Sequence, residues 1–403
     1  MRNSDDRIAI TGLGCVSAAG DSLAATLASI DAGERRFSPS PFAGVAPGSP
    51  VFVCEAALPG PETLSRTARL ALAAANEALA QAGLEPSFGM GRVAVCLGTS
   101  VGASLHFREY YAAWRSGNEA YPLESVTMYR ESNPSLAVAS FYGFDGPMQT
   151  IANACSSGAD AIGLAASWLR MGLCDVAVAG GADALSEITY TGFSRLMLAS
   201  PEACRPFDAS RSGLNLGEGA GVMVLERLCH AKERGKVPLG YMEGYGTATD
   251  SYHLTSPHPE AAGLKKAYAQ AFAEHGERGG EHRTNLAFVN AHGTGTKTND
   301  AAEGAFFAGF LPGVPFVATK GATGHTLGAA GGVEAVLTLA HLRRGLIPAS
   351  PGFLSPDPAI PSAPVSAPTP VVGRFAASQS LAFGGNNSVL VFSAGESTYG
   401  EGA

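Results

Sequence analysis

The chain of 403 residues is rich in small residues, with 51 glycines, and only 15% of its residues are charged. The glycines follow no three-residue period, which excludes a collagen-like chain, and a hydrophobic content of 46% excludes a disordered one. The net charge of −8, from 27 Lys and Arg against 35 Asp and Glu, argues against a general nucleic-acid binder. It still allows a local basic patch for an acidic protein, and the low charge is consistent with a subunit interface.

Cysteine content and hydropathy limit the cellular setting. The seven cysteines are an odd number and form no Cys-x-x-Cys pair, which argues against a disulfide scaffold or a zinc site. No apolar run reaches the length of about 18 residues that indicates a transmembrane helix. The apolar stretch 8–19 follows Asp5 and Asp6, so a strand and turn fit it better than a secretory signal. We expect a cytoplasmic protein that binds neither membranes nor nucleic acid.

Short β-branched runs alternate with helical stretches along the chain, which is typical of α/β layers whose sheets are covered on both faces. Apolar periodicity predicts helices over 63–82 and 156–171, each followed by a glycine that ends it. The pattern divides the chain into two similar halves, 1–240 and 241–403. We predict strands at 7–11, 92–96, 175–178 and 221–225 in the first half, and at 286–290, 316–319, 375–378 and 388–392 in the second.

Cys155 is the first candidate for chemistry. It lies in the segment Thr150-Ile-Ala-Asn-Ala-Cys-Ser-Ser-Gly-Ala-Asp160, directly after a strand-like run and before a predicted helix. Unpaired N–H groups and the dipole at a helix N-terminus favour negative charge, so a thiol there is biased toward the reactive thiolate. The alternative interpretation is a small buried hydrophobic residue, which is common for an isolated cysteine.

Two histidines in glycine-rich turns favour the catalytic interpretation. His292 follows a predicted strand within Asn290-Ala-His-Gly-Thr-Gly-Thr-Lys-Thr-Asn-Asp300. His325 lies in Thr319-Lys-Gly-Ala-Thr-Gly-His-Thr-Leu-Gly, where we expect Gly324 and His325 to open a helix of very small residues. A single loop histidine is more often a satisfied polar residue than a catalyst, but two beside strand ends are harder to dismiss.

One cysteine with two histidines suits thioester chemistry. A soft sulfur nucleophile forms an acyl-enzyme, and imidazoles hydrogen-bond a developing enolate or oxyanion. No further Cys, His or carboxylate falls at a spacing that would complete a zinc site with them, so no metal is predicted.

At this point the sequence resembles the condensing β-ketoacyl-acyl carrier protein synthases of the thiolase superfamily. The ordered set of fragments runs nearly from end to end, and its Cys-His-His set is similar to that of the elongating type. The resemblance implies a five-layered α-β-α-β-α fold of two duplicated halves, the first carrying the nucleophile and the second both histidines. The matching fragments are Ile10-Thr-Gly-Leu-Gly14, the Cys155 segment, Cys204-Arg-Pro-Phe-Asp208, Leu216-Gly-Glu-Gly-Ala-Gly221, both histidine motifs and Leu381-Ala-Phe-Gly-Gly-Asn-Asn387.

The resemblance also implies an activity. Cys155 would take an acyl chain from a carrier-protein phosphopantetheine thioester, and His292 and His325 would assist decarboxylation of malonyl-carrier protein. The carbanion would then attack the acyl group on Cys155 and give a 3-ketoacyl-carrier protein. Loss of CO₂ drives this Claisen condensation, so the resemblance implies no redox or nucleotide cofactor.

Supporting roles follow from the same resemblance. Lys320 matches a lysine that organises His325 and the carboxylate of Glu303, although a solvated loop lysine is the alternative. Thr294 and Thr296 match positions that hydrogen-bond the pantetheine arm, with a turn-forming role as the alternative.

A glycine-containing segment near the end of the chain matches a gate beside the nucleophile. Phe383 matches a gating phenylalanine, and Gly384 and Gly385 give this segment backbone freedom. The backbone N–H groups of Cys155 and Phe383 match the oxyanion hole of the family.

Three further assignments concern the substrate and its delivery. Val101 aligns with a residue at the bottom of the acyl pocket, although core packing explains a valine equally well. Arg66, Arg69 and Arg205 are candidates for the basic docking site of an acidic carrier protein, and each is alternatively an ordinary surface arginine. Asn290 and Glu334 match positions that hold a monovalent cation in some members.

The sequence departs from the fatty-acid enzymes near this gate. It has Leu381-Ala-Phe-Gly-Gly-Asn-Asn387 where many of them have Phe-Gly-Phe-Gly-Gly-Thr-Asn, and Lys297 where they have proline. The differences leave fatty-acid, polyketide and polyene substrates open. A dimer is expected, either with a second copy or with a relative that lacks the nucleophile.

Other functions remain open at this stage. A non-catalytic subunit that binds carrier protein and a decarboxylase without condensation are both compatible with parts of the pattern. A dinucleotide-dependent oxidoreductase is suggested by Ile10-Thr-Gly-Leu-Gly-Cys-Val-Ser17, but the third glycine of that fingerprint is replaced by Ser17.

Overall fold

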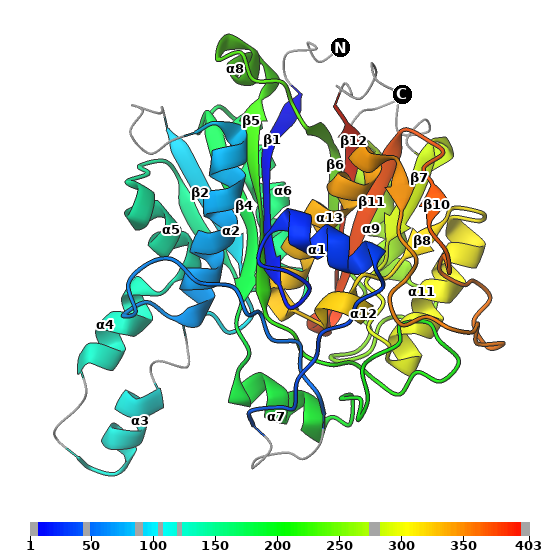
Figure 1. Cartoon of the computed structure of the whole chain (residues 1–403), viewed down its shortest axis with the longest axis horizontal. Helices are drawn as coiled ribbons and strands as arrows, with labels where there is room; N and C mark the ends of the chain where they lie inside the picture. Colours follow the sequence, from blue (N-terminus) through cyan, green and yellow to red (C-terminus); the bar gives the residue numbers. More distant parts are fainter. Residues whose placement is uncertain are drawn as a thin grey trace.

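Ten strands form one continuous sheet at the centre of the molecule (Figure 1). The computed structural model describes residues 7–42, 49–84, 92–103, 108–118, 123–273 and 283–395. The strand order is β3-β2-β4-β5-β1-β6-β12-β11-β7-β8, and β9 and β10 form a separate two-stranded ribbon. The strands are β1 (Ile8–Ser17), β2 (Val93–Gly98), β3 (Met148–Ile151), β4 (Val176–Asp183), β5 (Gly219–Arg227), β6 (Gly240–Thr249), β7 (Leu286–Asn290), β8 (Phe316–Val317), β9 (Leu346–Ile347), β10 (Thr369–Pro370), β11 (Phe375–Ala382) and β12 (Asn386–Ala394).

The sheet has two halves with the same topology. In each half three strands run parallel, β3-β2-β4 in the first and β8-β7-β11 in the second. Two antiparallel strands follow in each half, β5-β1 and β12-β6, and the halves join where β1 pairs with β6. Because β6 begins at Gly240, the second half of the sheet starts at the predicted boundary. The division of the chain into two domains after residue 240 stays a prediction.

Helices cover both halves of the sheet and give five layers. Helices α2 and α5 share an apolar cluster with the outer face of the first half, and α9 and α11 share one with the outer face of the second. Helices α6 and α13 lie between the halves in the largest cluster. The helices are α1 (Leu23–Asp31), α2 (Arg66–Ala82), α3 (Arg108–Arg115), α4 (Leu123–Glu131), α5 (Pro134–Tyr142), α6 (Ser157–Arg170), α7 (Glu187–Arg195), α8 (Leu228–Glu233), α9 (Ala262–Ala273), α11 (Lys297–Phe310), α12 (Lys320–Thr323) and α13 (Ala330–Arg344).

Glycines in β1 let helix α2 approach the strand very closely. A Cβ atom on Gly12 or Gly14 would lie 1.9 Å from the carbonyl oxygen of Ala78 or Ala74, respectively. The glycines of the Ile10–Ser17 fingerprint therefore lie inside a strand and serve helix packing. They do not form the strand-to-helix turn that a dinucleotide-binding fingerprint requires.

The two central helices also approach each other at their N-terminal ends. A Cβ atom on Gly158 of α6 would lie 2.6 Å from the backbone nitrogen of Gly332 of α13. A Cβ atom on Gly331 would lie 2.5 Å from the backbone nitrogen of Ala159. Both are closer than real Cβ atoms approach a backbone, so small residues are required here. This contact brings together the segments that precede the two helices.

The predicted element types agree with the structure, but several boundaries differ. Helix α2 begins at Arg66, because the Ser65 side chain accepts a hydrogen bond from Ala68 N and caps the helix there. The predicted first strand at 7–11 extends to Ser17, since its glycines still pair with β5. The prediction that a helix opens at Gly324 and His325 was wrong. These residues lie between α12 and a short 3-10 segment, η4 (Leu327–Ala329), where His325 forms an isolated β-bridge with Leu216, and α13 begins at Ala330.

Candidate active site

One cavity is lined by residues that the sequence places far apart. Cys155, His292 and His325 line it together with Thr294 and Phe383. Thr296, Phe193, Leu198 and Asn299 complete part of its wall. The structure therefore brings the predicted nucleophile, both predicted histidines and the predicted gate and pantetheine positions to a single site.

Cys155 lies in a tight turn between β3 and α6. The preceding residue, Ala154, has a φ of 52°, a left-handed conformation that costs energy for a residue with a Cβ atom. Ser157 supports the turn, because its hydroxyl donates to Ala154 O at 2.6 Å and accepts from Asn153 N at 2.7 Å. The turn thus holds the thiol at the N-terminal end of α6, as predicted.

The protonation of Cys155 differs from the expected thiolate bias. Burial raises the pKa of this thiol to about 12, although the positive charge of Lys320 and the backbone N–H of Phe383 act to lower it. The expected bias toward the thiolate is therefore outweighed, because removal of the sulfur from water raises the pKa more than these favourable interactions lower it. Cys155 is a neutral thiol before a substrate binds.

A buried carboxylate fixes the turn that carries His292. Glu303 of α11 accepts hydrogen bonds from His292 N at 2.8 Å and from Gly293 N at 2.7 Å. The side chains of Asn299 and Gln379 donate to the same carboxylate at 2.6 and 2.7 Å. Four donors hold Glu303, so its position is fixed relative to the backbone of His292.

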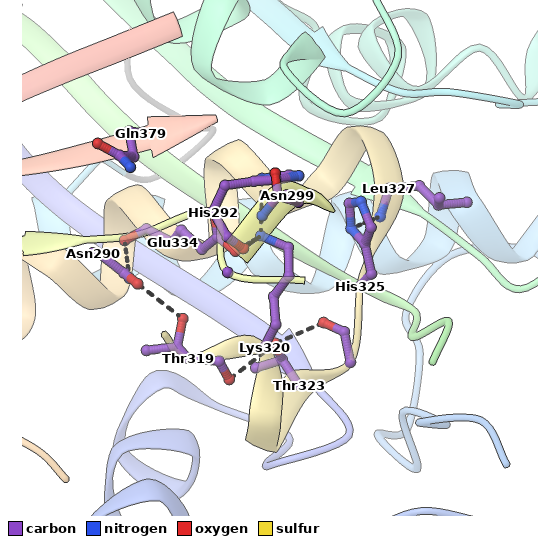
Figure 2. A network of polar contacts seen from close by, with 12 residues as sticks. Asn290, His292, Asn299, Thr319, Lys320, Thr323, His325, Leu327, Glu334 and Gln379 are labelled. Atoms are coloured by element: carbon purple, nitrogen blue, oxygen red, sulfur yellow. Dashed lines mark hydrogen bonds and ion pairs between the residues drawn. The ribbon is translucent and has the colours of Figure 1, made fainter. Parts of the chain in front are cut away.

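Lys320 occupies the centre of the polar network in Figure 2. Its Nζ donates to the carbonyl oxygen of His292 at 2.6 Å and lies 3.1 Å from His292 Nδ1. Its ion pair is with Glu334 of α13, and both side chains are almost completely buried. The direct contacts of Lys320 are therefore with His292 and Glu334, whereas Glu303 bonds to the backbone of the His292 turn. Lys320 acts on Glu303 and His325 through its charge, and its role in organising these two groups stays a prediction.

His325 is oriented by the turn that precedes α13. Its Nδ1 accepts a hydrogen bond from Leu327 N at 3.3 Å, and Leu327 has a φ of 54°. The rings of His325 and His292 lie with centroids 5.2 Å apart and planes at 85°. The two imidazoles therefore meet edge to face beside the thiol.

The hydrogen bonds determine the tautomer of each histidine. Both Nδ1 atoms face a donor, Lys320 Nζ for His292 and Leu327 N for His325, so the ring proton lies on Nε2 in each case. Burial lowers the pKa of both imidazoles well below the usual range, and the charge of Lys320 lowers both further. The site therefore presents two neutral imidazoles with Nε2–H donors, an arrangement suited to stabilising negative charge on oxygen.

The predicted gate lies directly against the nucleophile. Phe383 begins a short 3-10 segment, η5 (Phe383–Gly385), and its backbone N–H lies close enough to the Cys155 sulfur to lower the pKa of the thiol. Its ring packs on Phe193 of α7 with centroids 5.4 Å apart. Gly384 and Gly385 have φ values of 85° and 81°, a conformation that glycine adopts without strain.

The remaining predicted residues fall into different environments. Thr294 and Thr296 line the cavity, and their hydroxyls bond each other at 2.9 Å. Val101 does not line this cavity but lines a separate hollow with Tyr129 and Thr150. Its role at the bottom of the acyl pocket stays a prediction.

The three candidate docking arginines have separate partners. Arg66 forms an ion pair with the buried Glu218 at 2.6 Å, and Arg69 donates to the carbonyl oxygen of Leu58 at 2.7 Å. Arg205 lies 3.9 Å from Glu202. Arg66 is therefore engaged in a structural ion pair, and a role of these residues in docking stays a prediction.

Two buried aspartates at the site were not singled out by the sequence. Asp183 accepts hydrogen bonds from Thr99, from Ser100 N and from Gly328 N, and thereby ties the end of β2 to the segment before α13. Asp160 of α6 is the second, and its four donors are described below. Asp160 lies in a first helical turn, where an aspartate is usually a capping residue, and Asp183 ends β4, so the sequence carries no signal for these long-range contacts.

The surroundings of Asn290 and Glu334 bear on the predicted cation positions. The Asn290 side chain bonds Thr319 and the carbonyl oxygen of Glu334, and Glu334 Oε2 has no hydrogen-bond partner among the described residues. Across the parts of the chain that the structure describes, no group of three Cys, His, Asp or Glu is arranged to hold a metal ion.

In the same parts, no helix is both long and apolar enough to span a bilayer.

The comparisons with known proteins agree on one family. The family models described as Beta-ketoacyl synthase, N-terminal domain and C-terminal domain match residues 56–231 and 239–353. The chain is 31% identical over 385 residues to the tetracenomycin polyketide synthase ketoacyl synthase alpha subunit of Streptomyces glaucescens, which covers 89% of each chain. It is 37% identical over 267 residues to the mitochondrial 3-oxoacyl-[acyl-carrier-protein] synthase of Arabidopsis thaliana, covering 62% of this chain and 57% of the relative.

A solved structure gives the same result for the fold. The ishigamide ketosynthase/chain length factor superposes with a TM-score of 0.86 at 27% sequence identity, covering 96% of this chain and 99% of that chain. The expected thiolase-like fold and the resemblance stated from the motifs are thus confirmed. The chain belongs to the β-ketoacyl synthase family and is a condensing enzyme of the acyltransferase type.

Proposed function

We propose that this β-ketoacyl synthase elongates an acyl chain held on Cys155, using malonyl-carrier protein as the donor of two carbons. The observation that carries the assignment is the single cavity in which a thiol faces two neutral imidazoles whose Nδ1 atoms are both occupied. A thiol can hold the acyl chain, and two Nε2–H donors can stabilise an enolate, so one site supports both halves of a Claisen condensation.

The first step transfers the acyl group to the enzyme. The Cys155 sulfur attacks the thioester carbonyl of acyl-carrier protein, the new C–S bond forms, and the bond to the pantetheine sulfur breaks. The thiol proton leaves with the pantetheine as its free thiol. Because burial keeps Cys155 protonated, the negative charge of this step develops only with a thioester in place. In this proposal the N–H groups of Cys155 and Phe383 bind the oxyanion.

The second step generates the carbon nucleophile. Malonyl-carrier protein loses CO₂ and leaves an enolate on the thioester oxygen, which His292 and His325 stabilise by donating their Nε2–H groups. Lys320 is a positioning residue in this step, because its bonds to His292 Nδ1 and to Glu334 hold the ring and its tautomer. A neutral donor suits an enolate, since an imidazolium would be more costly to bury here.

The third step forms the carbon–carbon bond. The enolate carbon attacks the acyl carbonyl on Cys155, the C–S bond breaks, and the 3-ketoacyl product leaves on the carrier protein. The cysteine sulfur departs as a thiolate and takes up a proton, which restores the thiol. Thr294 and Thr296 line the cavity and have hydroxyls suited to the amides of the pantetheine arm, and no further cofactor is needed.

A second subunit is part of the proposal. Strand β3 is the last strand at one end of the sheet, and its Met148 is exposed, as is Trp114 of the neighbouring α3–α4 region. An exposed edge strand with apolar side chains is a ready site for pairing. Two proteins similar to this chain are described as an alpha subunit and as a ketosynthase/chain length factor assembly, which supports a heterodimer as well as a homodimer.

The partner and the pathway stay part of the proposal. An acidic acyl carrier protein is the expected partner, with Arg205 beside the Gly295 turn as a docking candidate. The relatives include a 3-oxoacyl-[acyl-carrier-protein] synthase and a polyketide synthase subunit. Fatty-acyl, polyketide and polyenoyl chains are therefore all expected as acyl donors. We also propose a cytoplasmic location, because the seven free cysteines suit a reducing compartment.

A non-catalytic carrier-binding subunit is the second candidate function. It is suggested by the chain length factor in the assembly similar to this chain. The intact cavity with Cys155, His292 and His325 favours the catalytic assignment, because a binding subunit has no need of two oriented imidazoles beside a thiol.

The test is to incubate the purified protein with short, long and polyenoyl acyl-carrier proteins and to measure its intact mass. An acyl adduct that is absent from Cys155→Ala supports the proposal, and the preferred donor identifies the chain. No adduct with any donor, even when a chain-length-factor-like relative is co-expressed, would contradict it and favour the binding role.

A further inference from the structure

The two proposed oxyanion donors lie on separate segments of the chain. The N–H of Cys155 belongs to the turn between β3 and α6, whereas the N–H of Phe383 belongs to η5 between β11 and β12. Their separation is therefore not determined by local backbone geometry. A contact between the two segments must keep both N–H groups directed at one oxygen atom.

The structure contains such a contact in the side chains of two asparagines. Asn386, directly after η5, donates from Nδ2 to Oδ1 of Asn153 at 2.7 Å. Asn153 lies two residues before the nucleophile, and its own Nδ2 donates to Asp160 Oδ2 at 2.8 Å. Asp160 in turn accepts from Tyr245 at 2.9 Å and from Ser388.

The chain of donors determines the orientation of both amides. Asp160 is surrounded by donors, with Ser156 also donating to it at 2.8 Å, so it must receive the NH₂ group of Asn153. The oxygen of Asn153 is then turned toward Asn386 and can only accept. Asn386 must therefore present its NH₂ group, and neither amide can flip without losing a hydrogen bond.

The other attachments of η5 reach a different part of the molecule. Gly384 N donates to Leu254 O at 2.8 Å, and Gly385 O accepts from Asp250 N at 2.8 Å. Both bonds tie the segment to the loop after β6. The amide pair, in contrast, joins the end of this segment to the side chain of Asn153 in the nucleophile turn.

We propose that Asn386 is a positioning residue that, through Asn153 and Asp160, sets the distance between the two oxyanion donors on Cys155 and Phe383. The inference rests on the proposed function and deepens it. Loss of the bond leaves substrate binding in place but lets the Phe383 N–H drift from the oxygen it must hold in the transition state. Loss of an oxyanion donor costs about 10²–10³ in kcat, so looser alignment of one donor is expected to cost about tenfold.

The experiment compares Asn386→Ala, Asn386→Asp, Asn153→Ala and the double alanine variant in steady-state condensation. The acyl donor is saturating and malonyl-carrier protein is varied. We expect each single variant to lower kcat about tenfold and to change the KM for malonyl-carrier protein less than about twofold. The double variant should be no more than about threefold slower than either single variant, because both substitutions break the same bond.

Asn386→Asp separates hydrogen bonding from packing. Aspartate has nearly the shape of asparagine, but it would place an acceptor against Asn153 Oδ1, so its loss in kcat should equal or exceed that of Asn386→Ala. A role in packing alone predicts that Asn386→Asp stays close to the wild type. The control is Gln270→Ala on α9. It removes another hydrogen bond of a side-chain amide, in which Gln270 Oε1 accepts from Thr247 N at 3.0 Å, and it should leave kcat unchanged.

The outcomes distinguish this inference from the proposed function. If the wild type condenses but Asn386→Asp matches it, or if the two alanine losses multiply, the positioning role is overturned. A kcat loss that follows a parallel loss of melting temperature in all Asn386 variants would also overturn it. If the wild type forms no elongated product, the proposed function itself fails.

Discussion

The two halves of the sheet share a topology but carry opposite kinds of chemistry. Each half places a helix between the sheets, α6 in the first and α13 in the second, after a short edge strand. Each also packs an outer helix on glycines of the strand that joins it to the other half: Gly12 and Gly14 of β1 contact α2, and Gly244 and Gly246 of β6 contact α9 in the same manner. The two halves thus repeat the same helix-to-strand packing.

The residues before the two central helices are what differ. The segment before α6 carries Cys155. The segments before α11 and α13 carry the two histidines and Lys320, and the helices α11 and α13 themselves carry the buried Glu303 and Glu334. In the proposed mechanism, one half holds the acyl chain and the other generates and stabilises the carbanion. The comparison teaches that the fold supplies the meeting point of two helix ends, while residue identity at each end supplies a separate step.

The variants with the largest expected effects test whether each half of the chain carries out its own step. Cys155→Ala should abolish the acyl adduct and lower condensation by at least about 10⁴-fold, yet release CO₂ from malonyl-carrier protein. His292→Ala and His325→Ala should lower CO₂ release by about 10²–10³-fold and keep the adduct. Intact mass measures the adduct, and ¹³CO₂ release measures decarboxylation.

Cys174→Ala is the matched control for this test, because Cys174 is buried just beyond the other end of α6. It should retain both activities. If removal of Cys155 and removal of either histidine abolished the same steps, the division of labour between the halves would be wrong.

The next effect concerns the buried ion pair of the second half. Lys320→Met leaves Glu334 buried without its cation, and we expect a loss of about 3–5 kcal/mol in the free energy of unfolding. The double substitution of Lys320→Met with Glu334→Gln removes both charges and should recover most of the stability. It should not recover decarboxylation, because His292 loses the donor that holds its tautomer.

Urea unfolding together with CO₂ release measures the two quantities. Recovery of both stability and activity in the double variant would show that Lys320 is only a structural partner.

The stability of the fold is expected to depend on pH because of Glu226, a buried carboxylate of the first half. Burial alone would raise the pKa of Glu226, but hydrogen bonds from His230, Arg234 and Thr11 outweigh it and lower the pKa to about 2. A lowered pKa stabilises the fold above about pH 5, and this contribution of about 3 kcal/mol is lost as the pH falls through about 2. Glu334 of the second half has the opposite shift, since burial raises its pKa to about 7 despite Lys320.

Melting temperatures between pH 2 and 5 test the assignment to Glu226. Glu226→Gln should be less stable at pH 6 and should have a flatter acid limb than the wild type. An unchanged acid limb would mean that other carboxylates govern acid unfolding.

The smallest expected effect tests the contact between the central helices. Gly331→Val places carbon atoms against the backbone of Ala159, so we expect a loss of about 1–3 kcal/mol and a fall in kcat as the Cys155 and His325 segments move apart. Gly309→Ala is the control, because its Cβ meets nothing within 4 Å in helix α11. Alanine there should stabilise the protein by about 0.5–1 kcal/mol without changing kcat. Chemical unfolding and condensation rates measure both.

Features with a local signal were predicted from the sequence. Gly83 ends α2 in a left-handed conformation, as a glycine after a periodic helical stretch indicates. The placement of Cys155 before a helix and of His292 after a strand also follows from local pattern, and the motif order named the family. The structure places all three predicted chemical side chains in one cavity.

Features that depend on tertiary contacts were not predicted. The choice of Glu334 over Glu303 as the partner of Lys320 depends on how α13 packs against the β7 end, which no spacing reveals. The pKa of Cys155 depends on burial that the sequence does not show. The engagement of Arg66 by Glu218 joins residues 152 positions apart. The asparagine pair at Asn153 and Asn386 is similarly non-local.

The central claim is tested most directly by a single turnover of the preloaded enzyme. The protein carrying an acyl group on Cys155 is mixed with malonyl-carrier protein labelled with ¹³C, and the enzyme and product masses are followed in time. We predict that the adduct disappears at the rate at which a carrier-bound 3-ketoacyl product, two labelled carbons longer, appears. Release of CO₂ with the adduct unchanged, or loss of the adduct as free acid, would contradict it.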